Sequence, residues 1–395
     1  SGKPSTEVTT KLTGPFNNLG VPGAKSYHLI APGYGNVAGV AGGLANPYFA
    51  RFATSASTTI VADALAQDPT FFSLWIGGND ILGYATSGGS GKNQTGNLDP
   101  KTYASNDITD PNVFASAYST IVNALTAKGA KGVVANLPYV TALPYFTTVP
   151  FNPLSNAVLG GGNVAVGQAT VNALNTQLYG PLKQALTAFG AGDRINLMST
   201  TTANPLLIRD ESLANLSAQL TAAFTPSLGA ATAAFYGQIF GQARQATKDD
   251  LVVLTTQSVI GTAPAGIPVP LNKFGITYPL QDKDVLTKDE ILEVKTATDA
   301  YNATIKSVAD AKGLAFVELK GVTDKLASGG IVYNGYNTTS TFVTGGMFSL
   351  DGVHPSPRGY AIIANLFTEA INTKYGSNFK SVNVGLYRIL YPESL

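Results

Sequence analysis

The chain has 395 residues, a formal net charge of +1 and no cysteine; 44% of its residues are hydrophobic and only 12% are charged. The length and the hydrophobic share predict a folded protein with a large core, built as one domain over residues 1–395 with room for an insertion. The balanced charge excludes an electrostatic surface for nucleic acid, and the missing cysteines exclude disulfides, thiolate metal sites and cysteine nucleophiles.

Targeting features are few. No stretch of 18 or more apolar residues is present, so we expect no membrane-spanning helix. Residues 1–7 lack the basic start and apolar middle of a signal peptide, which suits a mature or processed start. The scarcity of charge, together with the abundance of Gly, Ala, Thr, Ser and Asn, is typical of bacterial proteins that work outside the cytoplasm. We therefore expect an extracytoplasmic protein.

Apolar runs bounded by Gly and Pro predict strands, and these alternate with segments of helical periodicity. In chain order we expect a strand at 16–19, a helix at 57–66, a strand at 71–76, a helix at 112–128, a strand at 132–137, a helix at 171–189, a strand at 194–198, a helix at 289–312, a strand at 314–319 and a last helix that reaches residue 367. The two strands 71–76 and 132–137 are expected to be buried on both faces. This alternation predicts a three-layer α/β fold with a mainly parallel sheet.

Residues 205–286 interrupt the alternation and are too long for a connection, so we expect an inserted helical region. Its segment 216–240 is apolar and carries no charge. Two interpretations are open for this segment, a lid over a lipid-like substrate and a buried helix pair, of which the buried pair is favoured. Asp282, Asp284 and Asp289 lack the spacing of a calcium-binding loop, so we expect a solvated acidic loop there and no metal.

The strongest chemical motif is Asp351-Gly-Val-His354-Pro, which precedes the last apolar helix. A general base needs an imidazole whose other ring nitrogen is held by a carboxylate. An Asp and a His three residues apart on a tight turn can present both groups to one site. We therefore expect His354 to be a general base and Asp351 to orient it. The alternative is an Asp that caps the helix beside an incidental His.

Two weaker motifs follow predicted strands. Asn79 lies in Gly-Gly-Asn-Asp directly after strand 71–76, and its amide could donate to a developing oxyanion. Gly23 ends the turn after strand 16–19, where a backbone N–H can approach a substrate oxygen closely. Each motif alone is also ordinary turn chemistry.

Taken together, these motifs are in the order found in the SGNH/GDSL hydrolases, and the chain resembles that family from about residue 16 to residue 367, apart from the insertion. The resemblance implies an SGNH-hydrolase-like fold. It also implies that the Gly23 N–H and Asn79 form the oxyanion hole, with His354 as the base and Asp351 as its carboxylate. The general character is similar to the lipoprotein-type members from Bacteroidetes outer membranes, so an outer-membrane association and partner are expected.

One family motif is missing. The family opens with Gly-Asp-Ser after its first strand, and that serine is the nucleophile, but these 395 residues contain no Gly-Asp-Ser. Ser26, Ser57 and Ser73 do not lie in strand-end turns of the required kind. The nucleophile is therefore expected outside this chain.

The implied function is hydrolysis of carboxylic esters, on lipid or acetylated-glycan substrates, by a Ser–His–Asp mechanism that uses no cofactor. The alternative is a non-catalytic relative that binds lipid or glycan as an accessory protein at the outer membrane. In that case Asp351 and His354 would serve only the structure.

The resemblance also predicts where the missing strand belongs. In the family, the serine-bearing strand lies between the strand before Gly23 and strand 71–76. Its loss would leave unpaired backbone groups, each of which costs roughly 1–3 kcal/mol when buried. We therefore expect an upstream segment of the same protein to fill that place, as a bound peptide or a separate chain. Direct pairing of 16–19 with 71–76 would contradict this expectation.

Overall fold

The computed structural model describes Glu7 and residues 10–389, and the structural statements below concern those residues. They form a mixed α/β protein with a small parallel sheet and several helices. The chain divides into two compact units. The first unit contains residues 1–84, 91–143 and 293–395, and the second contains residues 85–90 and 144–292.

The first unit holds the parallel sheet and its helices. Its helices are α1 (Val37–Val40), α2 (Pro47–Ala50), α3 (Ile60–Leu65), most of α4 (Asn79–Thr86), α5 (Pro111–Thr126), most of α12 (Lys288–Ala311), α13 (Lys320–Ser328) and α14 (Pro357–Tyr375). Its strands are β1 (Phe71–Leu74), β2 (Lys131–Ala135), β7 (Ala315–Val317), β8 (Ile331–Tyr333) and β9 (Tyr336–Thr338).

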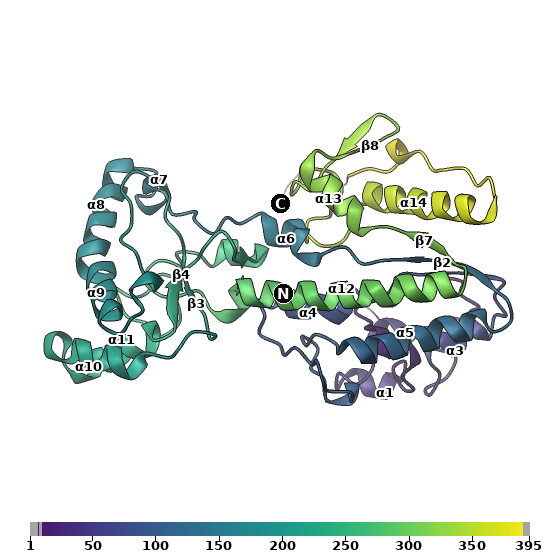
Figure 1. The fold of residues 1–395 in the computed structure, drawn as a ribbon, viewed down its shortest axis with the longest axis horizontal. Helices are drawn as coiled ribbons and strands as arrows, with labels where there is room; N and C mark the ends of the chain where they lie inside the picture. The colour runs from purple at the N-terminus through teal and green to yellow at the C-terminus, as the bar shows by residue number, and fades with distance from the viewer. Residues whose placement is uncertain (1–6, 8–9, 390–395) are drawn as a thin grey trace. The chain divides into compact units, whose positions relative to one another are not determined.

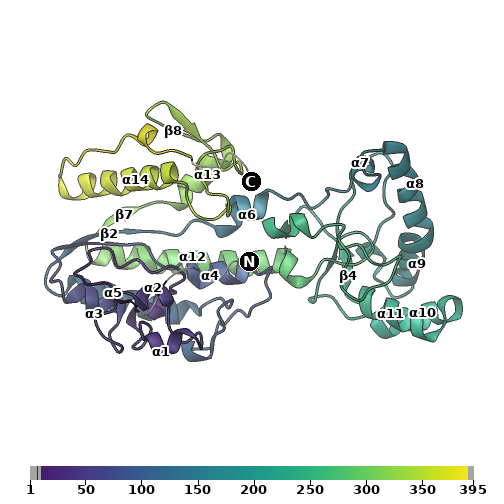
Figure 2. The same ribbon diagram turned by 180° about the vertical axis from the view of Figure 1, so that it is seen from behind.

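The sheet has the order β1-β2-β7 with every pair parallel, as the alternation predicts. Its register places Phe72 opposite Gly132 and Val134 opposite Phe316. The helix α14 packs against β2 and β7 from one side, and α12 lies on the other side together with α5 and α3 (Figure 1, Figure 2). Buried side chains between β2, β7 and α14 form part of the core.

The start of this unit differs from the prediction. Residues 16–19 form no strand, and the expected strand 71–76 is an edge strand of four residues with alternating exposed and buried side chains. The backbone at 16–20 is bonded to side chains instead: the Phe16 carbonyl accepts from Gln67, and the Gly20 N–H donates to the Asn18 carboxamide. A strand needs a neighbouring ladder, and residues 16–19 and β1 are not paired with each other.

The second unit has its own core. Its helices are α6 (Pro144–Thr147), α7 (Asn156–Leu159), α8 (Val164–Leu174), α9 (Gly180–Ala188), α10 (Ser217–Leu228) and α11 (Ala230–Phe240), with a π-helical turn at Asn175–Tyr179 between α8 and α9. Its strands form the antiparallel pairs β3 (Leu207–Arg209) with β4 (Ala243–Gln245) and β5 (Leu251–Val252) with β6 (Val285–Leu286). The predicted insertion, 205–286, lies inside this unit.

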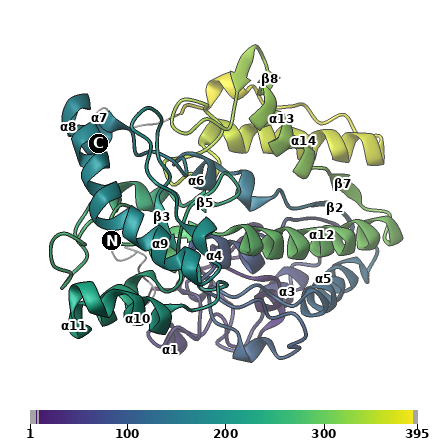
Figure 3. The ribbon, with the colours of Figure 1, turned by 60° about the vertical axis from the view of Figure 1, so that its left-hand side comes forward.

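Within the second unit, α10 and α11 pack against each other (Figure 3). Leu220, Phe224 and Phe240 of this pair belong to the buried core, so the helix pair is packed from within the unit itself.

One expected strand of the second unit is absent. The expected strand 194–198 does not form: Arg194 ends a 3-10 turn, and side chains bond to backbone donors of the residues after it, since the Asn196 N–H bonds to Gln245 and the Met198 N–H bonds to Asn175. Buried Ile195 and Met198 gave this segment its strand-like apolar pattern.

Candidate functional site

The predicted base and its carboxylate are joined in the structure. The Nδ1 atom of His354 lies 2.6 Å from Oδ2 of Asp351. The other oxygen of Asp351, Oδ1, accepts from the Ser349 hydroxyl and from the backbone N–H groups of Val353 and His354. The carboxylate thus fixes the orientation of the imidazole ring, and among the described residues no hydrogen bond engages Nε2 of His354.

This pair is held by a short hairpin before α14. Phe348 and Pro355 form an antiparallel bridge, and the Ser349 N–H donates to the His354 carbonyl at 2.8 Å. Gly352, at the turn, has a φ of 72°, a conformation that disfavours side chains. Ser356 then caps α14 by accepting from the Gly359 N–H. The hairpin and the helix cap therefore fix the position of both functional groups.

The electrostatics of Asp351 suit an orienting carboxylate. Partial burial raises its pKa, but the hydrogen bonds from Ser349, Val353 and His354 outweigh this effect and lower the pKa to about 2. Asp351 is therefore ionised over the whole physiological range. A carboxylate that stays charged favours the imidazole form with a proton on Nδ1, which leaves Nε2 as the proton acceptor.

The two predicted oxyanion residues lie close to each other in the first unit, one in a turn and one at the start of a helix. Asn79 is the first residue of α4, and its Nδ2 atom donates to the Ala24 carbonyl at 2.9 Å. Gly23, next to Ala24, has a φ of 76° and open space where a side chain would project. An amide nitrogen carries two hydrogens, so one remains for a substrate oxygen. The structure brings the Gly23 turn and Asn79 together.

Sequence reasoning missed the residues that hold this arrangement. Asp80 is fully buried and accepts from both the backbone N–H and the hydroxyl of Ser26, at 2.8 and 2.7 Å. This contact ties the segment after Gly23 to the start of α4. Burial raises the pKa of Asp80 to about 6, against the opposing effect of the Ser26 hydrogen bonds. The Asp in Gly-Gly-Asn-Asp was the available sequence indication.

The predicted base and the predicted oxyanion donors form two separate pairs of residues. Asp351 with His354 forms one pair, Asn79 with the Gly23 turn forms the other, and within the described residues no hydrogen bond links them. A cavity of about 1110 Å³ lies in the same unit. Ala24 and Asn79 line it, and so does Phe367 of α14, the helix that follows His354.

The other candidate side chains have structural settings. Ser26 is buried and bonded to Asp80, so it is not a free nucleophile. His28 accepts from the Lys25 N–H through Nδ1 and stacks on Tyr34. Burial and, next, the charge of Lys25 lower the pKa of His28 to about 4, so this ring stays neutral at physiological pH.

An acidic cluster in the second unit differs from the expected solvated loop. Glu211, Asp282 and Glu290 place carboxylate oxygens within 4.8 Å of one another, and among the described side chains they are the group that could hold a cation. Asp284 is buried and accepts from the Gln281 N–H. Glu290 also has a local partner, because the Thr287 N–H and hydroxyl both donate to its carboxylate.

Comparisons with known proteins add no identification. No family model, curated protein or solved structure matches this chain. Over residues 10–389, none of the helices combines the length and the apolar character needed to cross a membrane.

Proposed function

We propose that the protein hydrolyses carboxylic esters by a Ser–His–Asp mechanism, with the serine supplied by a polypeptide segment outside these 395 residues. The observation that carries this proposal is the contact between His354 Nδ1 and Asp351 Oδ2 at 2.6 Å. This contact has the geometry of a base held by its carboxylate, with the second ring nitrogen available for a proton.

In the proposed reaction, the serine oxygen attacks the ester carbonyl carbon while Nε2 of His354 takes the hydroxyl proton. The carbonyl oxygen becomes an oxyanion, and the Gly23 N–H and the Asn79 amide donate hydrogen bonds to it. The bond to the alcohol then breaks, and His354 returns its proton to the leaving oxygen. Water, activated by the same imidazole, cleaves the acyl-enzyme and regenerates the serine.

The proposal extends to the architecture and the setting. With one further strand beside β1, the sheet and its helices would form the three-layer α/β/α arrangement of the SGNH/GDSL hydrolases. The few charges and a cavity lined by both apolar and polar side chains fit a protein that acts on lipid or acetylated-glycan esters outside the cytoplasm, at or near the outer membrane. The motif order of Gly23, Asn79 and Asp351-x-x-His354 supports this family assignment.

The second candidate function is non-catalytic binding of lipid or glycan. The observation that favours it is the absence of Gly-Asp-Ser from the 395 residues. In that case the bond between His354 and Asp351 would serve only to hold the hairpin before α14.

The experiment is p-nitrophenyl ester hydrolysis by the chain completed with a strand that ends in Gly-Asp-Ser. We expect His354→Ala to lower turnover by about a thousandfold or more, because triad members act as a unit. His28→Gln is the matched control at the other histidine and should retain most of the activity. Turnover that His354→Ala leaves unchanged would overturn the proposal, and a completed chain without hydrolysis would favour the binding function.

A further inference from the structure

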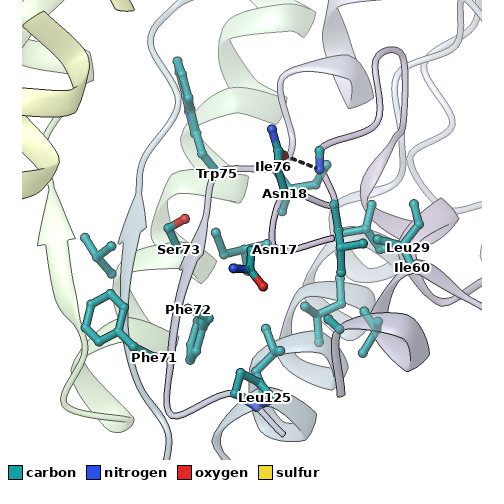
Figure 4. A pocket seen from close by; sticks show the side chains of 18 of the residues that line it. Asn17, Asn18, Leu29, Ile60, Phe71, Phe72, Ser73, Trp75, Ile76 and Leu125 are labelled. Atoms are coloured by element: carbon teal, nitrogen blue, oxygen red, sulfur yellow. Dashed lines mark hydrogen bonds between the residues drawn. The ribbon is translucent and has the colours of Figure 1, made fainter. Parts of the chain in front are cut away.

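The cavity of about 1110 Å³ borders the free edge of the parallel sheet, and we call it the edge cavity. It lies between β1 on one side and residues 17–21 on the other (Figure 4). Packed protein interiors hold few voids larger than a water molecule, and small-molecule pockets usually span about 300–1,000 Å³. The edge cavity therefore has the size of a site that a sizeable group fills.

One wall of the edge cavity consists of backbone groups that need partners. The Lys131 N–H donates to the Thr70 carbonyl, so even-numbered residues of β1 direct their backbone groups toward β2. By the alternation of a parallel ladder, Phe71 and Ser73 direct their N–H and C=O groups toward the opposite edge. Within the described residues, β2 is the only strand that pairs with β1. The outer edge of β1 can therefore pair with one more strand.

Apolar helices cover both faces of this edge. On one face, Phe367 and Ile371 of α14 line the edge cavity. On the opposite face, Ile60 of α3 and Leu125 of α5 line it (Figure 4). A strand placed beside β1 would be buried on both faces, which is the environment of an interior strand in a parallel sheet.

We propose that β1 binds an additional extended polypeptide strand in the edge cavity, supplied by a segment outside residues 1–395 and apolar at consecutive positions. The strand pairs with the free backbone groups of Phe71 and Ser73 and fills the space up to residues 17–21. It has at least about four residues, because β1 itself has four residues and spans about 13 Å at roughly 3.3 Å per residue.

The backbone wall decides between possible occupants. An acyl chain would fill the apolar space but could not bond to the Phe71 and Ser73 groups, whereas a strand satisfies both requirements. Residues 1–10 of the chain have the sequence Ser-Gly-Lys-Pro-Ser-Thr-Glu-Val-Thr-Thr, which is too polar to be buried on both faces. A second copy of the chain would offer only another four-residue edge, with residues 17–21 in its way.

The direction of the strand rests on the proposed function. Only a strand parallel to β1 would place its carboxyl end beside Asn79, which follows the carboxyl end of β1. A hydroxyl just beyond that end would then lie at the oxyanion donors. Binding itself depends on the sheet edge alone, so it can be tested without any hydrolysis.

The first test uses the only tryptophan of the chain, Trp75, which lines the edge cavity. The probe is an acetylated peptide of two lysines, five valine or isoleucine residues and Gly-Asp-Ser. We expect saturable binding that shifts the Trp75 fluorescence. Two N-methylated versions, with methyl groups on alternate residues of the valine segment, provide the control. Only the version whose methyl groups point away from β1 should bind, and equal binding of both would overturn the proposal.

The second test is amide hydrogen exchange. On addition of the peptide, the Phe71 and Ser73 amides should exchange at least about tenfold more slowly, whereas Phe72 and Leu74 already face β2 and should change little. Ser73→Pro removes one free donor without touching the β2 ladder and should abolish binding with the fold retained. Unchanged exchange at Phe71 and Ser73 with saturating peptide would overturn the proposal.

Two further outcomes identify other occupants. If laurate shifts Trp75 fluorescence and excludes the peptide while the amides stay unprotected, the edge cavity is a lipid site and the proposal fails. If Phe71 and Ser73 become protected at high protein concentration without peptide, the occupant is a second copy and it fails equally. Peptide binding without ester hydrolysis would leave this inference intact and overturn only the proposed function.

Discussion

The two compact units differ in how completely they are packed. In the second unit, a continuous cluster of fully buried side chains, including Leu154, Leu206 and Phe240, joins the helices to the small antiparallel sheets. In the first unit, the parallel sheet ends at β1, and apolar side chains from both faces border the edge cavity. The unit that carries His354 and Asn79 is thus the one with an unfilled sheet edge, whereas the second unit fills its own core.

Buried charge shows the same contrast. In the second unit, Arg244 bonds to both Asp210 and Asp250 at 2.6–2.8 Å, and Asp250 is also an acceptor for the Thr247 N–H. In the first unit, the buried Asp80 has hydrogen-bond donors in Ser26 and feels the charge of Lys25, but no salt bridge joins it to a basic side chain of the described residues. The difference suggests that the second unit uses its charges for stability and the first uses them to place loops around a site.

The largest effect is expected from a substitution that removes Arg244 from the buried ion pairs of the second unit. Arg244→Leu should lower the free energy of unfolding by about 3–5 kcal/mol, because Asp210 and Asp250 would stay buried without a cationic partner. Urea denaturation measures this. Lys248→Leu, which removes an exposed ion pair with Asp249, is the control and should cost less than about 1 kcal/mol. Equal losses in the two variants would mean that the buried network does not stabilise the unit.

The next prediction compares packing in the two units with matched substitutions. Leu220→Ala, in the closed core of α10, should cost about 3–4 kcal/mol, whereas Leu125→Ala, beside the edge cavity, should cost about 1–2 kcal/mol. The second leucine already lacks neighbours on one side. Native-state hydrogen exchange of α10 and α5 measures the two losses separately. A loss at Leu125 as large as that at Leu220 would show that the cavity is closed in solution.

These contrasts also explain what the sequence could predict. The strands β1, β2 and β7 and the helices α5, α12 and α14 carry strong local patterns, so their existence followed from the periodicity. The pairing of Asp351 with His354 is also local, since three residues on one turn separate them. Contacts between residues distant in sequence could not be predicted from a local pattern. Asp80 and Ser26 are 54 residues apart, and Asn79 and Ala24 are 55 residues apart.

The missed strands have a related cause. The expected strands 16–19 and 194–198 each include apolar side chains, but a strand depends on a partner that composition does not reveal. At 195–198, the side chains of Gln245 and Asn175 take the place of a partner. At 16–19, Gln67 donates to the Phe16 carbonyl, and the Asn18 side chain accepts from the N–H of the next residue, Gly20. Apolar content alone therefore did not predict which backbone ladders form, and Leu197 in the second segment is exposed.

Two buried carboxylates, Asp80 in the first unit and Asp250 in the second, should contribute to the pH dependence of stability with opposite signs. Burial raises the pKa of Asp80 to about 6, above its ordinary 3.8, so the folded state binds more protons than the unfolded state between these values. Stability from this group should fall by about 3 kcal/mol in all as the pH rises through both values, about 2 kcal/mol of it between pH 4 and 6. Asp250 behaves oppositely: burial raises its pKa, but Arg244 and Thr247 lower it below the ordinary value, so its contribution is lost on acidification.

The variant Asp80→Asn isolates the first effect. An asparagine can accept from the Ser26 N–H and donate to the Ser26 hydroxyl, so both contacts survive without a titrating group. Urea denaturation between pH 4 and 6 should show a smaller decline in stability for this variant than for the wild type. Parallel pH profiles in the two proteins would mean that Asp80 does not titrate in this window.

The smallest expected effect tests whether Asn79 of the first unit takes part in catalysis. In the completed chain, Asn79→Ala should lower ester turnover by about a hundredfold, equivalent to about 2.7 kcal/mol, because one oxyanion donor is lost. Its cost in stability should be only about 1 kcal/mol, since the side chain makes one hydrogen bond to Ala24. Asn79→Asp keeps the shape but removes the donor, so its turnover should fall at least as far. A purely structural Asn79 would give the reverse result, with stability lost in both variants and turnover per folded molecule unchanged. Hydrolysis rates normalised to the folded fraction therefore separate a donor to the oxyanion from a residue that only fastens the Gly23 turn to α4.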